Sequence, residues 1–565
     1  MRLRFPAALA LIFVLVLVTP WRCVAETDYS GVIPRLREHV REEMKEWGIG
    51  GVAFALTDGT RVVHAEGLGE AKVDSVFRAG SISKVFTALL VMKWVEAGRL
   101  SLDAPVAGYP GAVLPHQPFR DAPAIQLRHL LTHRSGLPRE TPVGGYLDGT
   151  EPGFDATCES LARCVLATPP GAKMRYSNIA PSIAGRVAAA VTGASFEAAH
   201  REHILAPLGM TRSTWMRTHL PPGALIVSRM RVADLDGLGG FHREESPVFD
   251  LGTLPAGNLF TTAPDLAQLL LMMSRAVRGE TGILKPETLA EMWRPQWEPG
   301  AGFGLGFALG KFRGHRTVGH NGAVYGHSAL LLFLPETQLG IVFLANEDIV
   351  NARVGRWGNV ALSLMIEAKT GERAPAGSSA PGGGVAGAST GSRPGSQTAL
   401  LAGRYESQSF WMELISGTND LYGSYSGQPC RLTATTEGKW VLNSRLHDDQ
   451  AVGVQFDNEG RATGLTVGTQ NFQRVNAEVP AFPPEWKRFC GVYGSTFIPV
   501  IVHEKFGHLY AMTENMVDYR LTPVARHVFA LPPGMYVDEL AVFLCDAEGR
   551  AHSVDFASMT FSRRR

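Results

Sequence analysis

A segment poor in bulky side chains divides the chain. Between residues 371 and 397 the sequence reads GERAPAGSSAPGGGVAGASTGSRPGSQ, in which glycine, alanine, serine and proline replace nearly all large apolar residues. Such a composition buries too little apolar surface to offset the entropy lost on folding, and it is typical of a flexible linker. A chain of 565 residues is also long enough for more than one domain. We therefore expect separate folding units before and after residues 371–397.

The N-terminus has the pattern of a secretory signal. The basic residues Arg2 and Arg4 precede an apolar run over residues 7–18, and small residues stand near Ala25. The run is shorter than the ~20 residues that a membrane-spanning helix needs, and Pro20 interrupts it at once. We predict a signal peptide over residues 1–25, cleavage after Ala25, and a secreted or periplasmic protein with no stable membrane span. An uncleaved anchor is the alternative.

The part after the linker contains an internal repeat. Four pairs of short sequences recur at an offset of 88 or 89 residues: GRYES and GVYGS at 403 and 491, RLT at 431 and 520, DNEGRA and DAEGRA at 457 and 546, and FQR and FSR at 472 and 561. Each copy alternates apolar and polar residues in short runs broken by glycine, asparagine and aspartate, which indicates antiparallel strands and hairpins. We predict two antiparallel, lipocalin-like β-barrels, over residues 398–476 and 477–565.

Charge and cysteine content bound the function. The chain carries 54 lysines and arginines against 53 aspartates and glutamates, so it has no basic surplus for nucleic acid. Cys158 and Cys164 are close in sequence, and a disulfide between them in an oxidising compartment stays open. His129 and His133 stand one helical turn apart, but no acidic third ligand has a metal-site spacing. We interpret both histidines as structural residues or as supports of the catalytic side chains, in preference to metal ligands.

The first part carries a serine and a lysine three residues apart. In FRAGSISKVFTALLVMKWVEAGRL, residues 77–100, apolar side chains recur at helical spacing after Ser81 and predict a core-facing helix. Ser81 then lies at the helix N-terminus, and Lys84 lies on the same face. A partly buried lysine disfavours its ammonium form and can accept the serine proton. The alternative is an N-cap serine with a solvated lysine.

Two more segments bear side chains suited to the same chemistry. In KMRYSNIAPSIAG, Tyr176 and Asn178 stand two residues apart, where a tyrosine can relay a proton and an amide can hold a lysine and a substrate carbonyl. The alternative is a turn with a buried tyrosine. In HRTVGHNGAVYGHSALLLFLPETQLGIVFLAN, small residues precede two predicted strands, 329–334 and 340–344, so a substrate can approach the backbone there. The backbone N–H groups of Ala323 and Ser81 would form an oxyanion hole.

These motifs together resemble a known family. Ser81-Ile82-Ser83-Lys84, Tyr176-Ser177-Asn178 and His320-Asn321-Gly322, in this order, resemble the three active-site motifs of the serine penicillin-recognising hydrolases. The nearest group contains class C β-lactamases, D-Ala-D-Ala carboxypeptidases, D-aminopeptidases and esterases, and VEAGRLSLDAPV, LRHLLTHRSGLP and AGNLFTTAPDLAQLL also match it. The resemblance covers residues 28 to 370. A family-like domain followed by two barrels is similar in layout to the D-aminopeptidases.

The resemblance implies a fold and a set of roles. The fold is α+β: a β-lactamase/transpeptidase-like domain over residues 26–370, with two lobes, an antiparallel sheet flanked by helices, and the active site between the lobes. Ser81 would be the acylated nucleophile, and Lys84 and Tyr176 would share acid/base work. Substrate binding is expected from Asn178, His320, Gly322 and Ala323. No metal or organic cofactor is implied.

The third motif bears on the substrate. β-Lactamases of this group usually have Lys-Thr-Gly there, whereas a neutral histidine followed by asparagine is a weaker anion site. The expected function is an exported serine hydrolase, a peptidase, amidase or esterase acting on D-amino-acid-type or small ester substrates. The alternatives are a β-lactamase and a non-catalytic protein that binds penicillin or cell-wall fragments.

Two expectations concern the surroundings of the site. The loop GGYLDGTEPGFD, residues 144–155, is expected to border the cleft with Tyr146 and Phe154. A further possibility is that the barrels gate the cleft. The expected partner is a small-molecule or peptide substrate, and the oligomeric state stays open.

Overall fold

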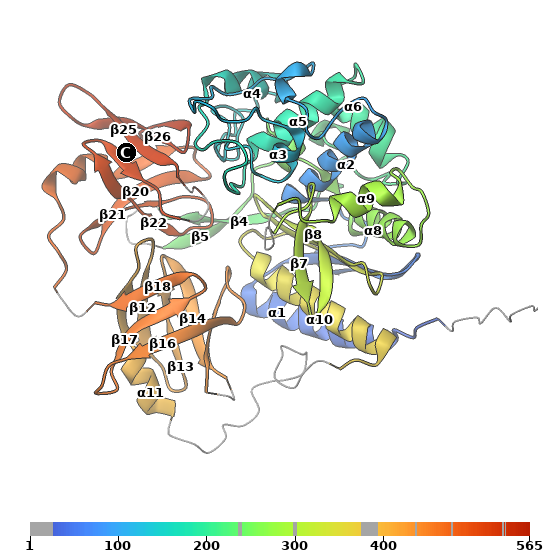
Figure 1. The fold of residues 1–565 in the computed structure, drawn as a ribbon. Helices are drawn as coiled ribbons and strands as arrows, with labels where there is room; N and C mark the ends of the chain where they lie inside the picture. Colours follow the sequence, from blue (N-terminus) through green and yellow to red (C-terminus); the bar gives the residue numbers. More distant parts are fainter. Residues whose placement is uncertain are drawn as a thin grey trace, which may run out of the picture.

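The computed structural model describes residues 26–234, 240–297, 302–373, 394–435, 438–475, 478–533, 536 and 538–564. The predicted signal peptide lies outside the described residues, as does most of the predicted linker. Three units follow one another along the chain (Figure 1). We call them the N-terminal unit (residues 26–373), the first barrel (394–475) and the second β-unit (478–564). In the described part of the chain, no helix is both long enough and apolar enough to span a bilayer.

A six-stranded antiparallel sheet forms the centre of the N-terminal unit. Its strand order is β2-β1-β10-β9-β8-β7, with β1 Gly51–Asp58, β2 Arg61–Gly69, β7 Ala308–Phe312, β8 His315–Val324, β9 His327–Leu334 and β10 Leu339–Ala345. Every residue of β10 is buried, because helices cover both faces of the sheet. On one face, α1 (Val32–Trp47) packs beside α10 (Asn351–Thr370), and α8 (Ala263–Val277) covers the other (Figure 1).

The remaining helices form a lobe beside the sheet. They are α2 Ser83–Glu96, α3 Leu127–Leu131, α4 Phe154–Ser160, α5 Ile179–Ala190, α6 Phe196–His200, α7 Leu254–Gly257 and α9 Pro286–Met292. The α2 helix is buried nearly all round against α5 and α7, because apolar side chains occupy almost its whole circumference. The helix predicted after Ser81 is therefore confirmed as the centre of this lobe, and the α+β fold expected for this part of the chain is present.

The first barrel is closed. Its eight strands pair in sequence order and back to the start: β11 Gly403–Glu406, β12 Trp411–Ser416, β13 Asp420–Tyr425, β14 Gln428–Ala434, β15 Trp440–Ser444, β16 Gln450–Phe456, β17 Ala462–Val467 and β18 Gln470–Arg474. Inward-facing side chains such as Tyr405, Leu432 and Phe472 fill the interior. The helix α11 (Pro394–Leu401) packs on β12. The predicted antiparallel barrel is confirmed for this copy.

The second β-unit differs from the closed barrel that the repeat predicts. Its strands form a four-stranded sheet, with β19 Gly491–Gly494, β20 Pro499–Lys505, β21 His508–Met512 and β22 Asp518–Arg520, and a five-stranded sheet, with β23 Thr522–Ala525, β24 Val528–Ala530, β25 Leu540–Cys545, β26 Ala551–Phe556 and β27 Met559–Ser562. The ladder stops between the short strands β22 and β23. At the other seam, Tyr493 of β19 forms an isolated bridge with Arg563, the residue after β27. One hydrophobic core still joins the two sheets.

Matching contacts show that the two C-terminal units are copies. The Tyr405 hydroxyl donates to the Leu401 carbonyl at 2.8 Å, and the Tyr493 hydroxyl donates to the Phe489 carbonyl at 2.7 Å. Each copy also has an arginine near its end, Arg474 in the first and Arg563 in the second. In both copies this arginine donates to backbone carbonyls that precede the first strand of the copy and to the carbonyl of the residue that begins its penultimate strand. The predicted repeat is therefore a repeat of structure as well as of sequence.

The cysteine pair that the sequence left open is not bonded. Cys158 and Cys164 are both free and buried, and burial raises the pKa of each thiol to about 12. A thiol of that pKa stays protonated and behaves as a small apolar group.

Buried ion pairs attach the first barrel to the N-terminal unit. The guanidinium of Arg445 lies 2.8 Å from the Glu347 carboxylate, and both side chains are at most 4% exposed. Beside this pair, Arg353 and Arg356 of α10 contact Asp448 at 3.0 and 2.9 Å.

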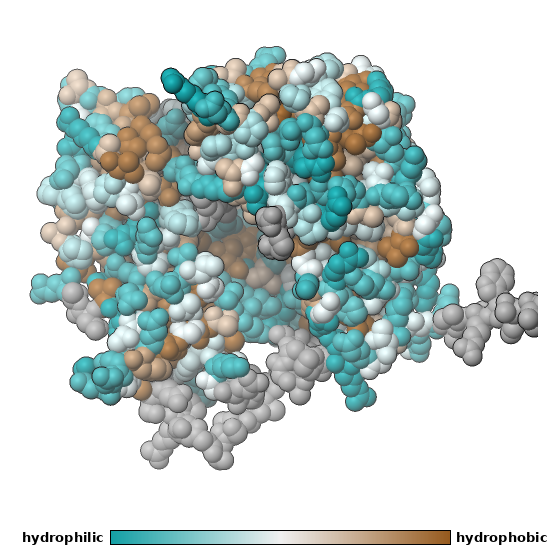
Figure 2. All heavy atoms as spheres, in the orientation of Figure 1, coloured by the Kyte–Doolittle hydropathy of each residue, from teal (hydrophilic) through white to brown (hydrophobic). Residues whose placement is uncertain are grey.

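The face of the molecule seen in Figure 1 is largely hydrophilic. Figure 2 shows a hollow near the centre of this face and exposed apolar residues over β25.

Replacing Arg445 should test this attachment. Arg445→Met should lower the free energy of unfolding by about 3 kcal/mol, because it removes one partner of a buried carboxylate. Urea unfolding followed by fluorescence measures the change. Arg461→Met is the matched control: Arg461 pairs with Asp457 on the surface of the same barrel, with 65% of its side chain exposed, and should cost less than about 1 kcal/mol. Equal losses in the two variants would contradict the importance of burial.

Candidate active site

Ser81 lies in a tight turn between strand and helix. The short strand β3 (Phe77–Arg78) leads into the 3₁₀ turn Gly80–Ile82, and α2 begins at Ser83. Gly80 has a φ of +53°, and a Cβ there would lie 2.7 Å from the Ala323 nitrogen of β8. Only glycine fits such a conformation at so close an approach. The turn therefore holds Ser81 against the edge of β8, at the N-terminal end of the central helix.

Lys84 is buried beside the serine. Its Nζ lies 2.9 Å from Ser81 Oγ, 2.8 Å from Asn178 Oδ1 and 2.8 Å from the Ala256 carbonyl, and the residue is 3% exposed. Burial holds the Lys84 pKa well below its usual value, and the positive charge of Arg139 lowers it further, against the carboxylate of Glu140. A neutral amine is thus favoured at this position.

Tyr176 approaches the same oxygen from the other side. Its hydroxyl donates to Ser81 Oγ at 2.8 Å, and its ring centroid lies 4.9 Å from Lys84 Nζ. Burial raises the pKa of Tyr176 to about 12, so the free phenol keeps its proton at neutral pH. The serine oxygen is therefore the meeting point of an amine and a phenol, as the sequence motifs predict.

Backbone and side-chain contacts fix the Tyr176–Asn178 segment. The Asn178 N–H donates to the Arg139 carbonyl at 2.7 Å, and the Asn178 amide donates to Glu140 Oε1 at 2.5 Å. The Ser177 N–H donates to His133 Nδ1 at 3.2 Å, and the His133 ring lies 4.3 Å from that of Tyr176. His133 thus has the structural role expected for it.

The sequence analysis missed Arg139 and Glu140. Glu140 is fully buried and touches the amide that binds Lys84. In the sequence, these two residues are a charged pair in a loop after a proline, a pattern that usually lies on the surface and gives no signal of burial.

The third motif brings β8 against the serine turn. A Cβ on Gly322 would lie 2.0 Å from the Ala79 carbonyl, so only glycine allows this contact. His320 is 3% exposed, and burial lowers its pKa to about 4. Its Nδ1 lies 2.5 Å from the Asn321 carbonyl, and its ring centroid lies 6.4 Å from that of Tyr176. The imidazole is therefore neutral and belongs to the same cluster as Tyr176.

A narrow cavity opens beside the serine. Its walls are formed by Ser81, Tyr146, Asn178, Leu251, Thr253, Ala256, Gly257, Ala323 and Val324. None of these lining residues carries a charge. Tyr146 borders the cavity as expected, whereas Phe154 begins α4 and packs against Phe196, with ring centroids 5.6 Å apart. The cavity thus presents the serine to a neutral, partly apolar group.

His129 lies away from the serine. It accepts from the Gln126 N–H at 3.2 Å and stacks on Trp297 with ring centroids 5.5 Å apart. Within the described ranges, no three histidine, cysteine, aspartate or glutamate residues are placed to hold a metal ion.

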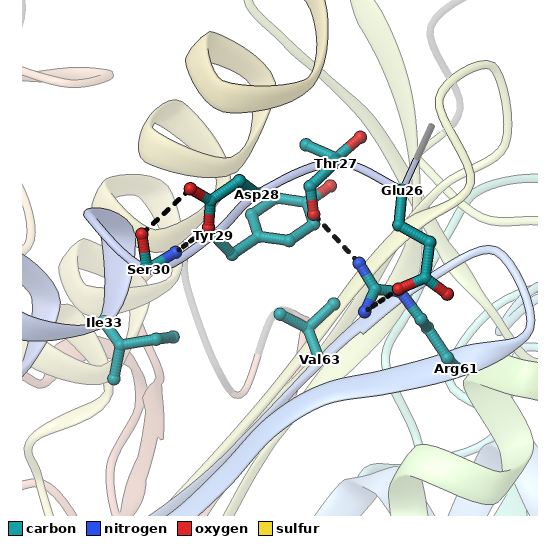
Figure 3. Close-up of a pocket in the computed structure, with 8 residues that line it drawn as sticks. All are labelled: Glu26, Thr27, Asp28, Tyr29, Ser30, Ile33, Arg61 and Val63. Carbon is teal, nitrogen blue, oxygen red and sulfur yellow. Dashed lines mark hydrogen bonds and ion pairs between the residues drawn. The ribbon is translucent and has the colours of Figure 1, made fainter. Parts of the chain in front are cut away.

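A larger cavity of about 380 Å³ lies at the start of the described chain (Figure 3). It is lined by Glu26, Thr27, Asp28, Tyr29, Ser30, Ile33, Arg61 and Val63. Its one serine, Ser30, donates to the Asp28 carboxylate at 3.0 Å, and Arg61 donates to the Thr27 carbonyl. Because no lysine or histidine accompanies this serine in the lining, the cavity does not compete with the Ser81 site as a centre for acyl transfer.

Comparison with known proteins agrees with the geometry. The Beta-lactamase family model matches residues 36–364, more than half of the chain. Penicillin-binding protein 4 of Amycolatopsis lactamdurans is 30% identical over 299 residues, covering 49% of this chain and 74% of its own length. Esterase EstB of Burkholderia gladioli is 31% identical over 294 residues, covering 45% and 74%.

A solved structure shares the fold. The octameric penicillin-binding protein homologue from Pyrococcus abyssi has a TM-score of 0.52 and 21% identity, covering 86% of this chain and 99% of its own. The structural match extends beyond the N-terminal unit, while the sequence matches are confined to about half of the chain. With the serine, lysine and tyrosine motifs assembled around one oxygen and the family model covering most of the N-terminal unit, the chain belongs to the β-lactamase family of serine hydrolases.

Proposed function

We propose that this protein is an exported serine hydrolase that forms an acyl-enzyme on Ser81 and cleaves small neutral esters or amides. One observation carries the proposal: Ser81 Oγ lies 2.9 Å from Lys84 Nζ and 2.8 Å from the Tyr176 hydroxyl. A serine with a buried amine on one side and a phenol on the other has both the base that activates it and the acid that its leaving group needs.

Acylation begins with proton transfer to the lysine. As a neutral amine, Lys84 donates its two protons to Asn178 Oδ1 and the Ala256 carbonyl, and its lone pair accepts the Ser81 proton. The serine oxygen then attacks the substrate carbonyl carbon, and the carbonyl oxygen takes up the negative charge. The N–H groups of Ser81 and Ala323 are proposed to stabilise that charge.

Release of the leaving group and hydrolysis use the same pair. The tetrahedral intermediate collapses to the ester of Ser81 as the bond to the leaving oxygen or nitrogen breaks. The leaving atom takes a proton from Tyr176 and departs as a neutral alcohol or amine. The proton on Lys84 then passes to Tyr176, so that both residues return to their starting states. Water then attacks the ester carbonyl while the Lys84–Tyr176 pair accepts a proton from it. The pair returns this proton to Ser81 Oγ as the bond between the acyl group and the serine breaks.

The cavity beside Ser81 is lined by uncharged residues, and such a lining favours a neutral substrate. Its lining has no lysine or arginine, and the pKa of His320 is lowered to about 4, so the third motif offers no fixed cation at neutral pH. A β-lactam carries a carboxylate and would lack a counter-charge from these residues. We therefore propose that peptidase, amidase or esterase activity on D-amino-acid-type or small ester substrates exceeds β-lactamase activity. The similarity to esterase EstB supports the ester class.

We also propose that the protein is exported and that its domains divide near the linker and between the two C-terminal copies. The basic start and the short apolar run before Ala25 support export to the periplasm or the medium after cleavage. The strand boundaries at Arg474 and Gly491 are compatible with the proposed division into 26–370, 398–476 and 477–565.

Covalent labelling tests the nucleophile. A fluorophosphonate should add once to the mature chain, as seen by intact-protein mass spectrometry, and Ser81→Ala should abolish both the adduct and the hydrolysis of p-nitrophenyl butyrate. Ser30→Ala, in the other cavity, is the control and should keep the adduct. Nitrocefin turnover on the order of 10 per second or more would place β-lactams first among the substrates, and the absence of any adduct would contradict the proposal.

The pH dependence tests the base. Because the base acts without its proton, kcat/KM should fall as the pH decreases through the apparent pKa of the Lys84–Tyr176 pair, and burial of Lys84 sets this acidic limb well below the usual lysine value of 10.5. Lys84→Arg should lose at least ~10³-fold in kcat/KM, since a guanidinium keeps its proton. His320→Gln should leave the limb in place, because His320 is already neutral. A limb that moved with His320 would assign the titration to the imidazole instead.

A further inference from the structure

The second β-unit reaches the motif residues through carboxylates. Glu539 accepts from the Arg139 N–H at 2.9 Å and lies 3.1 Å from Nη2 of Arg175, which precedes Tyr176. Glu514 lies 3.6 Å from the Arg139 guanidinium and accepts from the Tyr536 hydroxyl at 2.6 Å. The side chains of Glu514 and Glu539 are 8% and 5% exposed, so these contacts are shielded from water.

Arg139 lies between this unit and the catalytic tyrosine. Its guanidinium carbon is 5.4 Å from the ring centroid of Tyr176 and 5.7 Å from that of Tyr536. On its edge, the Nε lies 3.6 Å from both Glu140 and Glu514. The side chain is therefore stacked between two aromatic rings, one from each unit, and paired with a carboxylate from each unit.

The backbone of Arg139 supports the same segment. Its carbonyl accepts from the Asn178 N–H at 2.7 Å, while its N–H is bound by Glu539. One residue thus contacts the ring of Tyr176 through its side chain and the start of α5 through its backbone. The second β-unit supplies a partner for each of these two parts of Arg139.

We propose that Arg139 is a positioning residue for Tyr176 and Asn178, and that Glu514 and Glu539 hold it in place, so that the second β-unit completes the active site. This inference rests on the function proposed above. The cation stacks on the face of the phenol and restrains its ring. Its burial requires carboxylate partners, because an unpaired buried charge is strongly unfavourable.

The charges around the base pair support this role. Burial lowers the Arg139 pKa, but the carboxylates of Glu514 and Glu140 outweigh burial, so the guanidinium keeps its charge. Its charge lowers the pKa of Tyr176 against the effect of burial, and the carboxylate of Glu514 raises it. The charged groups that act on this pair are Arg139 and Glu140, with Glu514 acting on Tyr176; the titratable rings of His133 and His320 also face it, with centroids 4.3 and 6.4 Å from that of Tyr176.

Variants of the full-length mature chain test the inference. They are Arg139→Gln, Arg139→Lys, Glu514→Gln, and Asp448→Asn as the matched control, since Asp448 pairs Arg353 and Arg356 between the first barrel and the N-terminal unit. For each, fluorophosphonate titration counts the active sites, and p-nitrophenyl butyrate hydrolysis gives kcat, KM and the pH profile per active site. Melting temperatures report folding separately.

Positioning predicts a specific pattern. Arg139→Gln should lower kcat/KM per active site by on the order of 100-fold, mainly through kcat, because the tyrosine loses its geometry. The acidic limb should move to higher pH, since a charge that favoured deprotonation is gone. Arg139→Lys should restore the limb and only part of the rate. Glu514→Gln, which preserves shape, should lower kcat about tenfold and move the limb to lower pH. Asp448→Asn should lower the melting temperature and change kcat/KM by less than about twofold.

The contrary outcomes are separable. The wild type could be active while Arg139→Gln and Glu514→Gln keep kcat/KM per active site within twofold of it, or while their acidic limbs do not move. Either result would overturn the positioning role and leave the proposed function standing. Loss only of titratable sites and melting temperature would also overturn it, because it would mean that Arg139 merely stabilises the fold. A wild type that neither labels nor turns over the ester would overturn the proposed function and this inference together.

Discussion

The site depends on keeping one amino group out of water. Lys84 is held on a helix that is buried nearly all round, with its nitrogen bound to an amide oxygen, a backbone carbonyl and the serine hydroxyl. Burial disfavours the charged amine, so the lysine is suited to accept a proton, and the surrounding fold excludes the solvent that would restore the charge. The serine turn, the tyrosine segment and the edge of β8 are arranged around this nitrogen, and each of these is fixed by backbone contacts.

Much of this arrangement is predictable from the sequence. Ser81, Lys84, Tyr176 and Asn178 meet as their motifs predict, because these motifs encode local geometry: a serine one turn before a lysine, and two side chains on one short segment. The helix after the serine and the antiparallel strands of the repeat also follow from the local pattern of apolar residues. These features need little information about distant parts of the chain.

The rest depends on contacts between distant segments. Arg139, Glu140, Glu514 and Glu539 are charged residues in loops, and nothing near them in sequence indicates that they are buried against one another. The two C-terminal copies have similar sequence patterns, yet one closes into a barrel and the other divides into two sheets, since closure is decided by the pairing of a few short strands. The loop at 144–155 likewise brings Tyr146 to the cavity and leaves Phe154 in the helical lobe.

The two copies contact the N-terminal unit through different surfaces. The first uses Arg445 and Asp448 against Glu347 and α10, whereas the second uses carboxylates against the loop before Tyr176. Duplication followed by divergence of the loops is enough to produce this difference. Glu539 follows Arg139 by 400 residues, so the serine and lysine are synthesised long before this support. On the inference drawn above, a chain whose second β-unit is still being made or exported would carry its nucleophile without its full reactivity, and full hydrolytic activity would appear only once that unit has folded.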